Sequence, residues 1–194
     1  MPDALIARTP LGGIAGGELR THGAPSFVTL REMPASAMID LRLDPADATA
    51  LRATQQALAL ELPLTPGKTC ACAERTAWWF GPDQWLIVAP PDDVALLVPA
   101  LYETARSAVD VSDLRAEFEL AGPRAVDVLR KGCGVDLHPR VFSPGDCVLT
   151  LLGRVRVGLR QTDDRPGYRL LVERSVAPYL WDWLVDAMRE FTGA

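Results

Sequence analysis

Cysteine is scarce in this chain. The 194 residues include four cysteines, Cys70, Cys72, Cys133 and Cys147. Four scattered cysteines are too few for the disulfide framework of a small secreted domain, and the 48% hydrophobic content already allows a substantial core. We therefore expect reduced thiols in a globular protein.

The chain also lacks an excess of positive charge and long apolar runs. Its formal net charge is -5, so no overall basic field attracts a phosphate backbone and we expect no nucleic-acid partner. No apolar run approaches the roughly 18 residues that span a bilayer. Glycines interrupt the only candidate signal segment, at residues 12–17. These absences predict a soluble, cytoplasmic protein without a membrane partner.

Residue groupings typical of catalysis or metal binding are missing as well. Cys70 and Cys72 form a close pair, but no second close pair of Cys or His completes a four-ligand zinc site. His22 and His138 lack a neighbouring nucleophile and carboxylate, so we interpret both as structural. The glycines of residues 12–17 lack the flanking strand and helix of a phosphate-binding turn. We predict no catalytic residue, no bound cofactor and no metal in this chain.

The first half alternates strand and helix patterns. Residues 1–36 mix Gly, Pro and Ser with short apolar pieces, which is typical of an arm lying across a surface. Residues 38–43 alternate like a half-buried strand. Asp44 as N-cap, Pro45 in the first turn and Asp47 as an acid near the helix dipole then predict a helix that lasts until Pro63. Further along the chain, the sequence predicts a loop (67–74), a hairpin (77–88) and a helix opened by residues 90–93. Pro99 inside that helix implies a kink or a later start.

The second half repeats this order. A strand ends near Leu120, and Gly122-Pro123 begins a helix. Three strands and a final helix follow, at 147–152, 155–161, 168–172 and 175–191. The pattern predicts an α+β fold of two ferredoxin-like βαβ-type lobes with antiparallel or mixed sheets. The domain after the arm is expected to cover residues 37–194, with lobes of about 37–108 and 109–194.

Two aromatic residues of the final helix are interface candidates. Trp181 falls on its apolar face, whereas Trp183 falls on the opposite face, near Tyr179. Exposed aromatic side chains are enriched at protein interfaces. We predict that Trp183 and Tyr179 contact a partner; the alternative is that another part of the chain covers Trp183.

Several motifs between about residues 38 and 191 occur in a recognisable order. They are WFGPDQWL (79–86), DVSDL (110–114), FELAGPRA (118–125), VLRKGC (128–133), VDLHPR (135–140) and LWDWL (180–184). Taken in this order, they resemble the gamma subunit of heterotetrameric sarcosine oxidase. The succession of strand, Gly-Pro and helix is also similar to folate-binding aminomethyltransferase domains of the glycine cleavage T-protein type, which implies a fold of that kind.

The resemblance implies a non-catalytic gamma subunit that assembles with alpha, beta and delta subunits. In that family the other subunits carry FAD, FMN, NAD and zinc, and sarcosine is oxidatively demethylated with tetrahydrofolate as the one-carbon acceptor.

One departure from the T-protein pattern favours a non-catalytic role. Those enzymes carry an acid pair after a glycine in the strand that follows the helix, which corresponds to residues 153–158 of this chain. No Asp or Glu occurs here from Cys147 to Thr162, so the carboxylates that would handle protons are missing. The alternative is a stand-alone folate-binding aminomethyltransferase-like enzyme or, from Lys131-Gly132-Cys133, an iron–sulfur maintenance factor.

Overall fold

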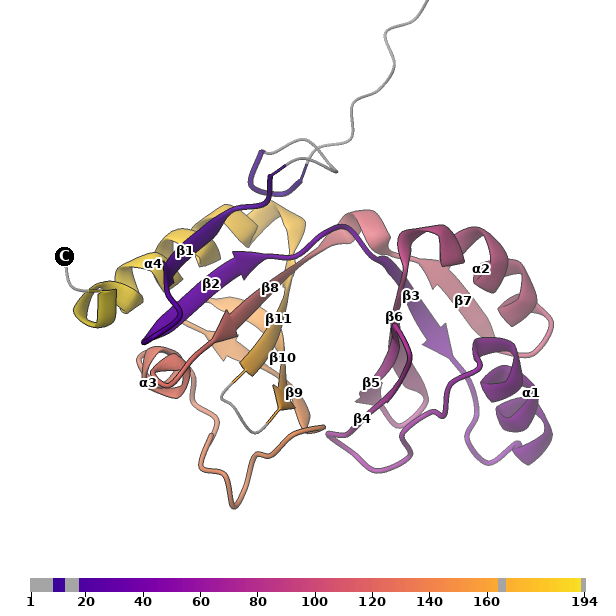
Figure 1. Ribbon diagram of the computed structural model, residues 1–194. Coiled ribbons are helices and arrows are strands. Elements are labelled where there is room, and N and C mark those ends of the chain that lie inside the picture. Colours follow the sequence, from indigo (N-terminus) through magenta and orange to yellow (C-terminus); the bar gives the residue numbers. More distant parts are fainter. Residues whose placement is uncertain (1–8, 13–17, 164–166, 193–194) are drawn as a thin grey trace, which may run out of the picture. The chain divides into compact units, whose positions relative to one another are not determined.

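The computed structural model describes residues 9–12, 18–163 and 167–192, which form two compact units (Figure 1). Unit 1 combines Met1–Ala35, Asp113–Pro144 and Leu149–Ala194, and unit 2 combines Ser36–Ser112 and Gly145–Val148. Each unit carries its helices on one face of a sheet (Figure 1). The predicted α+β fold with two sheets is confirmed.

Unit 2 is built on a five-stranded antiparallel sheet with the order β4-β5-β6-β3-β7. Without the edge strand β4, this is the strand order of a ferredoxin-like fold. Buried residues of β3 and β6, among them Ile39 and Trp85, form the core with Leu58, Leu97 and Leu101 of the helices. The elements are β3 (Ala37–Arg42), α1 (Ala48–Leu58), β4 (Thr69–Cys72), β5 (Arg75–Gly81), β6 (Gln84–Ala89), α2 (Val94–Tyr102) and β7 (Ser107–Asp110).

The local signals of unit 2 explain most of these elements. The hairpin predicted around residues 81–84 is confirmed as β5 and β6. Helix α1 ends at Leu58 rather than near Pro63, because Ala59 adopts a left-handed conformation (φ 48°) and the N–H of Leu60 donates to Gln55 O. The loop predicted for residues 67–74 is wrong for its centre: pairing with β5 makes Thr69–Cys72 a strand.

Asp47 caps helix α1. The predicted cap at Asp44 is wrong, because Pro45 and Ala46 form a turn and the helix begins only at Ala48. Its Oδ1 accepts hydrogen bonds from the backbone N–H groups of Thr49 and Ala50, both at 3.0 Å. We expect Asp47→Ala to lower the free energy of unfolding by about 1 kcal/mol, because two helix-terminal donors lose their protein acceptor. Urea titration of the full chain measures this loss. Asp47→Asn retains a cap acceptor and should restore most of it; equal losses for both variants would contradict the capping account.

Unit 1 is built on a six-stranded sheet with the order β1-β2-β8-β11-β10-β9. From β8 to α4 the elements follow the order seen in unit 2, and β2 pairs with β8 as β7 pairs with β3. The three strands and the final helix predicted for the second half are confirmed. The elements are β1 (Thr21–Ala24), β2 (Val28–Glu32), β8 (Arg115–Ala121), α3 (Ala125–Arg130), β9 (Cys147–Leu152), β10 (Val155–Asp163), β11 (Gly167–Glu173) and α4 (Ala177–Thr192).

The N-terminal segment contributes strands to this sheet. We predicted an arm for residues 1–36, and its described part contains β1 and β2. Strand β2 has only two buried apolar residues, Val28 and Leu30, so its alternation is too short to be recognised without its partner β8. The lobe boundary predicted near residue 108 lies close to Ser112, where the first segment of unit 2 ends.

Gly145–Val148 returns to unit 2. The N–H of Thr69 donates to Gly145 O, the N–H of Cys147 donates to Gly67 O, each at 2.8 Å, and Lys68 forms an ion pair with Asp146. Among the described residues, no helix is long and apolar enough to cross a membrane.

Candidate functional site

The sheet of unit 1 has an apolar face and a charged face. Phe118 is buried and meets Trp181 of α4 edge to face, with ring centroids 5.5 Å apart. Because successive side chains of a strand point to opposite faces, Glu117 and Glu119 project from the other side. We call that side, away from α4, the charged face of unit 1.

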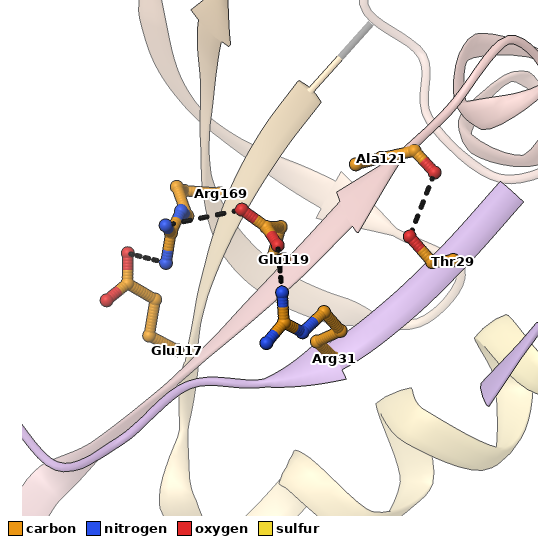
Figure 2. Close-up of polar contacts among 6 residues, drawn as sticks. All are labelled: Thr29, Arg31, Glu117, Glu119, Ala121 and Arg169. Carbon is orange, nitrogen blue, oxygen red and sulfur yellow. Dashed lines mark hydrogen bonds and ion pairs between the residues drawn. The ribbon is translucent and has the colours of Figure 1, made fainter. Parts of the chain in front are cut away.

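The antiparallel register aligns charges across this face (Figure 2). Arg31 of β2 lies opposite Glu119 of β8, and Glu119 lies opposite Arg169 of β11. Arg169 in turn lies opposite Arg160 of β10. The charges form a row that crosses four strands. Directly opposed residues of opposite charge stabilise a strand pair, which applies to Arg31–Glu119 and Glu119–Arg169, whereas Arg169 and Arg160 are like charges.

Arg169 binds both carboxylates (Figure 2). Its Nη2 lies 3.3 Å from Glu119 Oε1 and its Nη1 lies 3.8 Å from Glu117 Oε1. Arg31 Nη1 approaches the other oxygen of Glu119 at 3.8 Å. The Glu117 side chain is only 13% exposed and that of Arg169 is 22% exposed, whereas that of Arg31 is 60% exposed. The Arg169 pairs are thus better shielded from water than the Arg31 pair.

Glu117 has a perturbed acidity. Burial raises the pKa of its carboxyl, the positive charges of Arg169 and Arg160 oppose the shift, and Glu119 adds to it, so the pKa lies above the ordinary value. Arg169 and Arg160 therefore favour the charged form of Glu117, against the effect of burial.

A pocket of about 410 Å³ adjoins this row and is lined by Thr29, Glu119 and Asp163, among other residues. The Thr29 hydroxyl donates to Ala121 O at 3.3 Å (Figure 2). A hydroxyl committed to a backbone carbonyl is not paired with a base, as an activated nucleophile would be. The lining carboxylates can accept hydrogen bonds from a ligand or a partner.

Sequence reasoning missed these acids. It considered only residues 147–162, whereas the carboxylates lie on β8, two strands from β10 in the sheet order. The signal was the alternation Glu117-Phe118-Glu119, which places two acids on one face of a strand and a core aromatic residue on the other. Only the register of β2 and β11 shows that arginines meet them.

Trp183 and Tyr179, the two interface candidates, differ in their surroundings. Trp183 is half-buried against two glycines: a Cβ added at Gly132 would lie 2.5 Å from its Cζ2, and one at Gly153 would lie 3.3 Å from its Nε1. The chain itself thus covers part of the indole. Tyr179 is 44% exposed. Of the two, Tyr179 presents the larger fraction of its surface to a partner.

The cysteines and histidines do not come together as a reactive group. Cys70 and Cys72 lie on β4, and burial, followed by the charge of Glu61, raises the pKa of the Cys70 thiol. His138 Nδ1 accepts a hydrogen bond from the N–H of Arg140 at 3.2 Å. Across the described ranges, no three His, Cys, Asp or Glu side chains gather in a way that could hold a metal ion.

Lys131 of the Lys-Gly-Cys segment makes structural contacts. Its Nζ donates to Ala187 O and pairs with Glu190 Oε1, each at 2.5 Å, and lies 4.9 Å from the Phe191 ring centroid. These contacts join the end of α3 to α4.

Comparison with known proteins identifies the family. Residues 42–190 match the sarcosine oxidase, gamma subunit family. The sequence is 36% identical over 190 residues to sarcosine oxidase subunit gamma of Corynebacterium sp. (strain P-1). This alignment covers 96% of this chain and 92% of the relative. This chain belongs to the sarcosine oxidase gamma subunit family. The gamma subunit of Arthrobacter sp. matches with the same identity and coverage.

Solved structures agree with this assignment. A chain of the heterotetrameric sarcosine oxidase from Corynebacterium sp. U-96, in complex with pyrrole 2-carboxylate, superposes with a TM-score of 0.80 at 33% identity, over 88% of each chain. The glycine cleavage aminomethyltransferase T from Bartonella henselae shares the fold at a TM-score of 0.60 and 13% identity, over 82% of this chain and 46% of that one. The predicted resemblance of this gamma-family chain and its T-protein-like fold are both confirmed.

Proposed function

We propose that this chain is the non-catalytic gamma subunit of a heterotetrameric sarcosine oxidase-type complex. The observation that carries the proposal is the match to gamma subunits over nearly the full length of both chains, at 36% identity. The similarity to a chain of a heterotetrameric sarcosine oxidase, at a TM-score of 0.80, supports it.

On this proposal, the alpha, beta and delta subunits are the partners and carry FAD, FMN, NAD and zinc, while tetrahydrofolate accepts the one-carbon unit. Three side chains that could take part in catalysis fit the proposed non-catalytic role. Glu119 is bound by two arginines, the Thr29 hydroxyl by a carbonyl, and the raised pKa of Cys70 disfavours its thiolate.

Tyr179 and Trp183 are proposed to contact one of these subunits. Tyr179 offers an exposed ring with a hydroxyl, a side chain frequent among interface hot spots. Trp183, held against Gly132 and Gly153, offers a fixed surface that loses little conformational entropy on binding.

The proposal is tested by assaying sarcosine oxidation with and without this chain. We expect the purified chain to be colourless and inactive, and the alpha, beta and delta subunits to yield a stable, active complex only when it is added. Binding of tetrahydrofolate by the isolated chain, together with turnover of a methylamine donor, would show that it is a stand-alone enzyme instead.

A further inference from the structure

Helix α2 of unit 2 is apolar on all sides. Its sequence, VALLVPALY, contains no charged residue. Leu97 and Leu101 are buried in the core of unit 2, but Leu96 is 66% exposed and Tyr102 is 64% exposed on the outer surface, with Ala95 and Pro99 exposed beside them. A helix that is apolar all round is ordinarily covered all round. The outer surface of α2 is therefore expected to be buried in the assembled protein.

The outer faces of α1 and α4 show the usual polar character. On α1 the exposed residues include Arg52 and Gln56, and on α4 they include Asp182, Asp186 and Arg189. Polar outer faces are those of helices that stay in water. Helix α2 differs because Leu96 and Tyr102 are exposed on a helix without any charged residue, whereas the exposed Tyr179 of α4 lies on a helix with charged residues. A contiguous exposed apolar surface marks an interaction site.

Acidic residues stand at both ends of the apolar surface. Asp92 precedes α2 and Glu103 follows it, and both are exposed. Within the described part of the chain, neither carboxylate forms an ion pair, whereas the adjacent Asp93 binds Arg75 Nε at 2.7 Å. A partner that covers α2 gains by placing Lys or Arg against these two ends.

The same acids disfavour a second copy of the chain as the occupant. A twofold axis that pairs two α2 helices antiparallel brings Asp92 of one copy toward Glu103 of the other, and a parallel pair brings like residues together. Both arrangements oppose like charges, which weakens self-association.

We propose that α2 is a docking surface for a different subunit, one that presents an apolar patch flanked by basic residues. This docking surface rests on the proposed function, since it would form part of the contact between the gamma subunit and its complex. Leu96 and Tyr102 are its apolar anchors, and Asp92 and Glu103 are its charged rim (Figure 1 shows α2).

The test measures how the double variant Leu96→Lys, Tyr102→Lys associates with the co-expressed alpha, beta and delta subunits. Lysine is a good helix former and suits an exposed position, so helix α2 should still form. The two lysines remove the apolar contact and repel a basic partner. We expect association to weaken roughly 30-fold or more. Gln56→Lys, on the exposed face of α1, is the matched control and should associate as wild type does.

A second measurement identifies the occupant. A photo-crosslinking residue at position 96 of the wild-type complex should form crosslinks to another subunit, at a peptide containing Lys or Arg. Glu103→Gln should flatten the salt dependence of association, because one rim charge is lost. Crosslinks only between two copies of this chain, or unchanged association of the double variant, would overturn the proposal.

The two proposals fail in distinguishable ways. If the wild-type chain does not join the complex, the proposed function is wrong. If the wild-type chain and the double variant both join it equally, the subunit role stands and only the α2 docking surface is refuted. Thermal unfolding of the double variant, followed by circular dichroism, should match wild type, since both replaced side chains are largely exposed.

Discussion

Replacement of Arg169 by methionine is expected to lower the free energy of unfolding by about 3–5 kcal/mol at pH 7, because it leaves a largely buried carboxylate without its counter-charge. Arg169 binds Glu117 and Glu119, whose side chains are 13% and 24% exposed. Methionine retains an unbranched side chain of similar length, so the loss reports charge more than packing. Urea unfolding of the full chain, followed by tryptophan fluorescence, measures it.

The pH dependence of this loss has a defined sign. Burial raises the pKa of Glu117, so the folded state holds a proton that the unfolded state releases, and stability falls as pH rises from the unfolded pKa through the folded one. Without Arg169 the folded pKa rises further, and this window extends to higher pH. The difference between Arg169→Met and wild type should therefore shrink as the solution is acidified.

Two further variants separate charge from structure. Glu117→Gln added to Arg169→Met removes the unpaired charge and should restore most of the lost stability. Arg31→Met, at a position 60% exposed, should cost less than about 1 kcal/mol because water screens its ion pair. A double variant as unstable as Arg169→Met alone would show that the charged face does not depend on this pairing.

Substitution of Gly122 by alanine is the second large effect. Gly122 has φ +121°, and an added Cβ would lie 2.6 Å from Phe27 O and 3.0 Å from Val28 Cα, both backbone atoms. Strain in the left-handed region costs roughly 1–2 kcal/mol, and forced overpacking costs roughly 1–3 kcal/mol. We expect a total loss of about 2–5 kcal/mol in the free energy of unfolding. Differential scanning calorimetry of the full chain measures the accompanying fall in Tm.

Gly145 supplies the matched control for this prediction. Its φ is +88°, but nothing lies within 4 Å of the Cβ that alanine would add. Gly145→Ala should therefore show only the conformational cost, about 1–2 kcal/mol. Equal losses at the two glycines would mean that the approach of β2 to the β8–α3 turn is not tight, contrary to the backbone contacts at Gly122.

The sequence predicts the elements whose signals are local. The Asp-Pro-Ala-Asp segment before α1, the turn between β5 and β6, and the apolar stripe of α4 each lie within a short window, and all three elements form. Helix α1 nevertheless begins later than predicted, with Asp47 rather than Asp44 as its cap. Strands β1, β2, β4 and β7 were missed because each has only four or five residues, too few to show a clear alternation. Strands β2 and β7 in addition pair with β8 and β3, which are distant in the sequence.

The charged face shows the same limit. Glu117 and Glu119 are visible in the sequence as acids two residues apart, but their pairing with Arg31 and Arg169 depends on strands about 50 to 90 residues away in the chain. Sequence periodicity assigns residues to faces, and only the sheet register brings particular side chains together. Trp183 shows a related limit. The indole packs against the backbone of Gly132 and Gly153, and glycines give no apolar signal in the sequence that would predict this contact.

Native mass spectrometry of the assembled complex tests the central claim most directly. When this chain is co-expressed with the alpha, beta and delta subunits, the account predicts one particle that contains this chain together with all three and oxidises sarcosine. A fully active particle of the other subunits from which this chain is absent would contradict its assignment as the gamma subunit.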